Sequence, residues 1–127
     1  MNPNLYLELS EVTEKKFPTG VNLSSEHIEL LHHAMGMVTE SGEFMDALKK
    51  TLIYGKELDK TNLREEVGDI LWYVAGALRL LDTTFEAEME RNIEKLKARY
   101  GEKFDAHKAL NRDLDTERKI LEGNVGG

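Results

Sequence analysis

NLREEVGDILWYVAGALRLL, residues 62–81, is the stretch that decides the fold. Its apolar residues recur at steps of three and four, the spacing of one face of an α-helix. These residues are Leu63, Val67, Ile70, Leu71, Val74, Leu78 and Leu81. Asn62 is expected to open the helix, because Glu65 stands three residues on, as in a capping box. A long helix with one apolar face needs a partner to cover it, so we expect helices packed on helices.

The segment before this stretch has the same periodicity. We expect Ser24 or Ser25 to cap a helix that runs to about Tyr54, where Gly55 ends it ahead of a polar loop, residues 56–60. The predicted core face of this helix consists of Ile28, Leu31, Met35, Val38, Met45, Leu48 and Leu52. The two long helices are therefore predicted to lie antiparallel to each other.

Shorter helices are expected on both sides of this pair. Residues 4–16 are predicted to form a first helix with Leu5, Leu9 and Val12 at helical spacing, followed by a break at residues 17–20. A fourth helix is expected after Thr83, which with Glu86 has the second capping-box spacing.

The fourth helix is expected to end at Tyr100 and Gly101, since glycine suits the left-handed position after a helix. Residues 106–122 are predicted to add a short helix, and residues 123–127 to form a frayed tail. No alternation typical of a strand persists, so the expected fold is a single all-α domain over residues 1–127, a bundle of four to five helices.

Composition limits the classes of function. The 127 residues suit one domain, and a formal net charge of −7 disfavours a broad nucleic-acid surface. No apolar run approaches the length of a membrane span, and the first residues lack the apolar core of a signal peptide. Cysteine is absent, which excludes a disulfide and a thiolate metal site and fits a reducing cytosol. We therefore expect a cytoplasmic protein with neither nucleic acid nor membrane as partner.

Two pairs of carboxylates carry the chemical information. Glu40 and Glu43 stand three residues apart on the first long helix, and Glu66 and Asp69 stand three residues apart on the second. Residues at this spacing share one face of a helix, so two helices packed side by side are expected to bring four carboxylates together. A single such pair is usually part of a solvated face; two pairs on successive helices are much less common by chance.

Four close carboxylates repel one another unless a cation neutralises them. Mg²⁺ prefers oxygen ligands and is commonly shared between carboxylates and phosphates, so Mg²⁺ is the expected cofactor and Mn²⁺ the expected substitute. Gly42 and Gly68 precede the second acid of each pair, and each costs roughly 1 kcal/mol relative to alanine in a helix. Two such costs at matching positions indicate close helix approach, or room for a metal or phosphate.

TESGEFMDAL (39–48), NLREEVGDILWYV (62–74) and NIEKLKARYGEKF (92–104) together resemble the MazG-like family of all-α NTP pyrophosphatases. The three blocks stand in the family's order, and the resemblance spans roughly residues 25–104. It leaves the first helix and the C-terminal extension, residues 106–127, without a counterpart.

The resemblance implies packed helices in a homodimer or homotetramer, with Mg²⁺ held by the residues matching Glu40, Glu43, Glu66 and Asp69. It implies hydrolysis of an NTP or dNTP to the monophosphate and pyrophosphate, by activated water attacking the α-phosphorus. Phosphoribosyl-ATP, dCTP and dUTP hydrolases share the architecture, so the preferred base is left open.

Asn92, Lys95 and Arg99 lie on one side of the fourth helix and are predicted to contact the phosphates or sugar of the substrate. Without the resemblance, a solvated basic face would be the better interpretation. Lys49, Lys50 and Lys56 are a second cationic group, for which complementing the helix dipole ranks slightly above a phosphate contact.

Other residues of interest have weaker interpretations. Trp72 and Tyr73 can stack on a base, but packing is the favoured interpretation. Glu29 and His32 have the spacing of a di-iron bundle motif, yet a second copy of that motif is missing from the sequence. The expected function is thus a nucleotide pyrophosphohydrolase, with a non-catalytic nucleotide- or protein-binding module as the alternative and a di-metal oxidase disfavoured.

Overall fold

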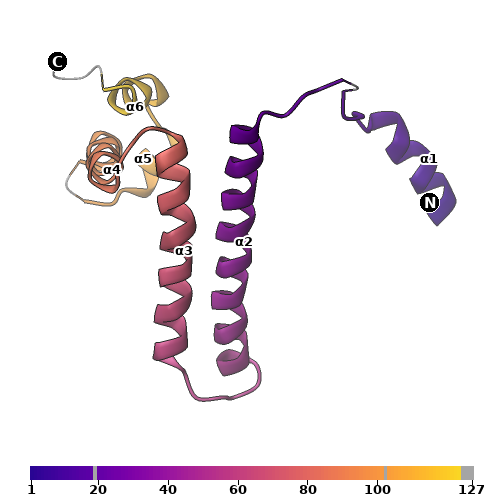
Figure 1. Cartoon of the computed structure of the whole chain (residues 1–127), viewed down its shortest axis with the longest axis horizontal. Helices are drawn as coiled ribbons and strands as arrows, with labels where there is room; N and C mark the ends of the chain where they lie inside the picture. The colour runs from indigo at the N-terminus through magenta and orange to yellow at the C-terminus, as the bar shows by residue number, and fades with distance from the viewer. Residues whose placement is uncertain (19, 102, 124–127) are drawn as a thin grey trace.

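The computed structural model describes residues 1–18, 20–101 and 103–123, and this part of the chain contains six α-helices and no β-strand. The helices are α1 (Pro3–Thr13), α2 (Ser25–Leu52), α3 (Lys60–Leu80), α4 (Phe85–Tyr100), α5 (Ala106–Leu110) and α6 (Leu114–Leu121) (Figure 1). The all-α prediction is confirmed.

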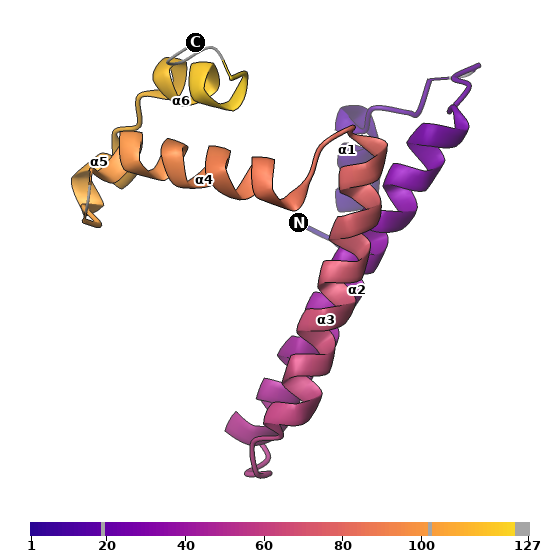
Figure 2. The same ribbon diagram turned by 60° about the vertical axis from the view of Figure 1, so that its left-hand side comes forward.

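The two long helices, α2 and α3, form an antiparallel hairpin, which is the most extensive helix contact in the described chain (Figures 1 and 2). Ser24 caps α2, its hydroxyl accepting from the His27 N–H at 3.2 Å. Asp59 caps α3 by accepting from the Asn62 N–H at 3.1 Å. The prediction that Asn62 opens this helix was therefore wrong, because Asp59 lies three residues upstream and supplies the cap itself.

Two glycines bring α2 and α3 into close approach, and the sequence interpretation chose a different pair. A Cβ on Gly36 would lie 2.2 Å from the Tyr73 ring, and one on Gly76 would lie 1.8 Å from the His33 ring. Gly42 and Gly68 face open space, with nothing within 4 Å of an added Cβ. The prediction that Gly42 and Gly68 allow close helix approach within the chain is therefore wrong. The open space beside the carboxylates agrees with the second interpretation, room for a metal or phosphate.

The C-terminal helices α4, α5 and α6 pack on one another and lie at the end of the hairpin away from its connecting loop (Figure 2). Thr84, rather than the predicted Thr83, caps α4 by accepting from the Ala87 N–H at 3.2 Å. Gly101 ends α4 with φ of 69°, as predicted. The single helix predicted over 106–122 is two short helices, because Asp113 supplies a second cap and starts α6.

The first helix, α1, stands apart from the hairpin (Figure 1). It begins at Pro3 after an Asn2 cap, one residue before the predicted start, and ends at Thr13, three residues before the predicted end. The predicted break at residues 17–20 includes Thr19, and residues 124–127 of the predicted tail likewise lie outside the described part of the chain.

The single chain has almost no buried core. Ile120 is the one buried hydrophobic side chain among the described residues, and it is still 7% exposed. Apolar positions predicted to be buried remain exposed, among them Val38 (72%), Met45 (70%) and Leu52 (78%). The chain exposes 10650 Å², whereas a folded monomer of 14.5 kDa is expected to expose about 6,900 Å². The predicted faces are thus apolar, but α2 and α3 alone cannot cover them.

None of the helices in the described residues combines the length and the apolar character needed to cross a bilayer.

Candidate metal centre

Three carboxylates from two helices meet between α2 and α3. Glu40 of α2 and Glu66 and Asp69 of α3 each offer an oxygen, and these oxygens all lie within 4.8 Å of one another. The three-residue step on α3 places Glu66 and Asp69 on one face, and antiparallel packing brings Glu40 opposite to them. Glu66 is the most enclosed of the three, and Asp69 is exposed.

The electrostatics of Glu66 show that these carboxylates are not compensated. Burial is the first cause that raises the pKa of Glu66, and the hydrogen bond and negative charge of Glu40 are the next. The charges of Asp69 and Glu43 raise this pKa further. The other three acids predicted from the sequence therefore all act on Glu66, and a cation at this point would relieve the repulsion.

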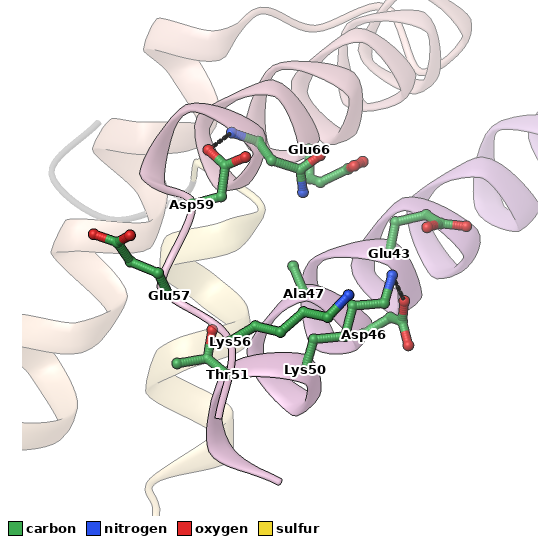
Figure 3. A pocket seen from close by; sticks show the side chains of 10 residues that line it. Glu43, Asp46, Ala47, Lys50, Thr51, Lys56, Glu57, Asp59 and Glu66 are labelled. Atoms are coloured by element: carbon green, nitrogen blue, oxygen red, sulfur yellow. Dashed lines mark hydrogen bonds and ion pairs between the residues drawn. The ribbon is translucent and has the colours of Figure 1, made fainter. Parts of the chain in front are cut away.

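Glu43 lies beside the cluster rather than within it. Together with Glu66 it lines a pocket of about 360 Å³ between the C-terminal half of α2, the α2–α3 loop and the start of α3. Figure 3 shows Glu43 and Glu66 on the two facing helices, with Lys56 and Glu57 coming from the loop. Glu66 belongs to both the cluster and the pocket, so the two features adjoin.

The donor set fits a hard divalent cation. Every ligand is a carboxylate oxygen, which Mg²⁺ and Mn²⁺ favour. Two ligands of one Mg²⁺ lie at most roughly 4.2 Å apart, and the three oxygens all lie within 4.8 Å of one another, so a small movement of the side chains would fit them to one ion. Glu29 and His32 do not belong to this cluster; His32 instead contacts His33 and Tyr73 through its ring, which removes the structural basis of a di-iron site.

The predicted phosphate-binding residues on α4 lie away from this centre in the same chain. Helix α4 shares its main contacts with α6 and α5 and leaves the hairpin at the end opposite to the pocket (Figure 2). Asn92 is exposed and Lys95 is half-buried. The three residues are thus not brought to the carboxylates by their own chain, and their role in phosphate binding stays a prediction.

Arg99 has a carboxylate partner of its own. Its Nε and Nη2 donate to Glu117 of α6 at 2.8 and 3.1 Å, and Arg112 donates to the same carboxylate at 2.6 Å. Glu117 is only 3% exposed. The hydrogen bonds from Arg99, followed by those from Arg112, lower the pKa of Glu117 to about 2. Arg99 therefore ties α6 to α4, a structural role that the sequence did not indicate.

The cations near the pocket differ in how they are engaged. Lys50 pairs with Asp46 at 2.8 Å, and Lys49 approaches the same carboxylate at 3.9 Å. Lys56 forms no ion pair with any residue that the structure describes, and its side chain lines the pocket. Of the three predicted cations, Lys56 is thus the one available for an anionic ligand.

The rings of Trp72 and Tyr73 cluster with the ring of His33 between α3 and α2. The Trp72 and Tyr73 rings meet edge to face, with their centroids 5.0 Å apart. Tyr73 packs against Gly36, as the packing interpretation predicted, while Trp72 is 60% exposed.

Three pocket residues were missed as site residues. Asp46 and Asn62 line the pocket, and Asp59 does so while capping α3. The signal was available, since Asp46 stands three residues after Glu43 and Asn62 four residues before Glu66. Helical spacing continued by one turn from each acid pair would have found both residues.

The comparisons with known proteins agree with the carboxylate geometry. A family profile described as the MazG nucleotide pyrophosphohydrolase domain matches residues 28–104, more than half of the chain. The chain belongs to the MazG family. The matched range includes the four predicted acids together with Asn92, Lys95 and Arg99, and it ends before α5 and α6.

A relative of this MazG chain is the Gene 37 protein of Mycobacterium phage L5, which is 35% identical over 75 residues. The matched region covers 55% of this chain and 65% of the relative, so the chain spans less than two thirds of that protein's length. No solved structure matches the chain.

Proposed function

We propose that this MazG-family chain is an Mg²⁺-dependent nucleoside triphosphate pyrophosphohydrolase. It converts an NTP or dNTP into the monophosphate and pyrophosphate. The observation that carries the proposal is the meeting of Glu40, Glu66 and Asp69 between α2 and α3, with the raised pKa of Glu66. An acid cluster without internal cations suits a metal-assisted reaction on a polyphosphate.

Glu40, Glu66 and Asp69 would hold the ion, and Glu43 would complete the set from the pocket side. A bound Mg²⁺ supplies a water of lowered pKa, orients the phosphates and offsets charge on the leaving pyrophosphate. The protein's own contribution is to hold the carboxylates in place on two helices that pack closely, with the Tyr73 ring against Gly36 and the His33 ring against Gly76.

The pocket beside the cluster is the proposed place for the phosphates. Lys56 is the uncommitted cation there, and the Asn62 side chain offers both a donor and an acceptor for a hydroxyl or phosphate oxygen. Glu57 and Asp59 also line the pocket, so an anionic substrate would enter together with its metal ion rather than alone.

A second copy of the chain is proposed to complete the site. The exposed area of one chain exceeds that of a folded monomer by about 3,800 Å², which leaves room for the roughly 1,000–2,500 Å² that each partner buries in an obligate dimer. Because α4 lies away from the carboxylates of its own chain, Asn92 and Lys95 would reach a triphosphate only from a neighbouring copy. Arg99 would do so only by giving up its hydrogen bonds to Glu117. The proposed unit is therefore a homodimer, or a homotetramer of such dimers, acting on the nucleotide pool of a reducing compartment.

Mixing two inactive variants tests the shared site. An Asp69→Asn chain lacks an acid, and a Lys95→Ala chain lacks a cation; Lys95 has no ion-pair partner in the described residues. If the site is shared, co-assembled chains recover roughly a quarter of the wild-type activity, because one site of each mixed dimer is intact. If each chain carries a whole site, mixing recovers nothing.

The alternative is a non-catalytic module that binds nucleotide without cleaving it. All four acids are intact, which favours catalysis. Nucleotide binding measured by calorimetry in the absence of any product, over a panel of NTPs and dNTPs with Mg²⁺, would favour the module instead.

A further inference from the structure

Helix α1 has an apolar face with no partner in its own chain. Leu5, Leu9 and Val12 recur at steps of four and three, so they form one stripe along the helix. All residues of α1 are exposed, and the helix shares no extensive contact with another described helix. It lies outside the region that matches the MazG family.

An isolated helix of this length is marginal in water. α1 has 11 residues, below the roughly 12–15 residues that an isolated helix needs even with favourable composition. It nevertheless has an Asn2 cap, whose side chain accepts from the Leu5 N–H at 2.8 Å, and a proline at its first position. The cap and the proline favour the start of this helix, but its apolar face is not covered. We therefore expect α1 to gain stability by docking on another surface.

A surface that fits α1 lies at the C-terminal end of α4. Ile93, Leu96, Tyr100 and Phe104 line a largely apolar hollow of about 440 Å³. Lys97 and Lys103 also line it, and neither forms an ion pair with a described residue. The hollow therefore offers apolar surface bordered by two free positive charges.

The charges of the two surfaces are complementary. α1 carries Glu8 and Glu11 and no lysine or arginine. Glu8 flanks the apolar stripe, so it meets the border of the hollow when the stripe enters it. We propose that α1 is an exchanged arm, whose Leu5–Leu9–Val12 stripe packs into the hollow at the end of α4 of a second copy of this chain.

The arrangement of the chain favours a second copy as the acceptor. In Figure 1, α1 and α4 lie on opposite sides of the α2–α3 hairpin. Residues 14–24 connect α1 to α2 and reach at most roughly 36–40 Å when extended, enough to carry the arm off its own hairpin. The surplus of exposed area fits the second copy proposed above, and an exchanged arm would add to that interface.

The absence of cysteine allows a direct test by cross-linking. One chain carries Glu8→Cys beside the stripe, and a second chain with a larger tag carries Lys97→Cys at the hollow; the two are co-expressed and oxidised. We expect a disulfide between the two tagged chains on a non-reducing gel. Leu7→Cys, on the opposite face of α1, is the matched control and should give little product with Lys97→Cys.

Three further variants test whether the yield depends on the docked face. Leu9→Ser in the Glu8→Cys chain should lower the cross-link yield ~10-fold or more, since a buried leucine is removed. Leu7→Ser should leave the yield unchanged, and circular dichroism checks that both variants remain helical. Asp69→Asn should also leave it unchanged, so the arm is tested independently of catalysis.

A single chain that carries both Glu8→Cys and Lys97→Cys tests docking within one copy. A disulfide within this chain, with none between chains, would overturn the proposal. Equal yields from Glu8→Cys and Leu7→Cys would also overturn it, because they would show a mobile arm without a docking face.

Discussion

Glu66 of α3 lies against Glu40 of α2, with Asp69 completing a group of carboxylate oxygens within 4.8 Å of one another. The pairing places like charges on two helices that must pack together for the hairpin to form. The repulsion between these carboxylates opposes folding of the metal-free chain. A bound divalent cation would make their contribution to folding favourable. The cluster is therefore best explained as a binding site, where local stability is lost for function.

Neutralising an acid of the cluster should abolish metal-dependent turnover without unfolding the chain. Asp69→Asn should lower kcat/KM by more than the ~100-fold typical of losing a residue behind the metal ligands. Helical content should stay unchanged, because Asp69 is exposed and no longer repels Glu66. Steady-state pyrophosphate release and circular dichroism measure the two effects.

Neighbouring acids provide the comparison for this prediction. Glu65→Gln alters an exposed acid beside Glu66 and should retain activity. Glu43→Gln should lower activity but weaken Mn²⁺ binding less than Asp69→Asn, since Glu43 lies outside the group of three. Equal loss of metal affinity in all three variants would show that general charge, not this geometry, binds the ion.

The glycines of the hairpin should respond in opposite directions. Gly36→Ala and Gly76→Ala place a methyl against the Tyr73 and His33 rings, so each should lower the free energy of unfolding by about 1–3 kcal/mol. Gly42→Ala and Gly68→Ala meet open space and should raise it by about 0.5–1 kcal/mol. Urea denaturation distinguishes them; destabilisation by all four would mean that a further copy packs over Gly42 and Gly68.

Glu117 should make the packing of α6 on α4 sensitive to acid. Hydrogen bonds from Arg99 and then from Arg112 hold the pKa of Glu117 at about 2, against its ordinary value of 4.5. Because the pKa of Glu117 is lower in the folded chain than in the unfolded chain, its ionised form stabilises the fold. This contribution is complete above pH 4.5 and is lost as the pH falls towards about 2. Urea denaturation between these pH values should show a steeper loss of stability in the wild type than in Glu117→Gln.

Asp115→Asn, an exposed acid on the same helix, should keep the wild-type pH profile. A Glu117→Gln profile parallel to that of the wild type would contradict the role of the Arg99–Glu117 pair.

A charge on the exposed stripe of α2 should dissociate the assembly. Val38 is 72% exposed in the single chain, so Val38→Asp costs little within the hairpin but buries a charge if a second copy covers it. Analytical ultracentrifugation should show the variant at a lower mass than the wild type. Thr39→Asp, at the neighbouring position of the helix, tests whether an added charge alone dissociates the assembly. A wild-type mass for Val38→Asp would show that the stripe is not an interface.

The sequence predicted the long hairpin and its acid pairs because helical periodicity is a local property. The steps from Glu40 to Glu43 and from Glu66 to Asp69 fix which side chains share a face. The cap at Asp59 was missed because Asp59 lies upstream of Asn62, the expected cap. The second short helix was missed because Asp113 caps a new helix inside the predicted one. These errors moved boundaries by a few residues and left the site intact.

Contacts between distant residues could not be predicted in this way. Gly36 and Gly76 make the close approach, rather than Gly42 and Gly68, because the crossing of α2 and α3 decides which glycine meets a ring. Arg99 was predicted to contact the phosphates or sugar of a substrate. Its partner Glu117 was not foreseen, because it lies 18 residues on, in a segment without a family counterpart. Faces predicted to be buried stay exposed because periodicity marks an apolar face but not the chain that covers it.

Release of pyrophosphate from a panel of NTPs and dNTPs, with Mg²⁺ and with EDTA, tests the central claim most directly. The wild type should yield pyrophosphate and the matching monophosphate in equal amounts with Mg²⁺ and none with EDTA, and Asp69→Asn should yield none in either. Release of orthophosphate, turnover that persists in EDTA, or no turnover of any nucleotide by a folded assembly would contradict the account.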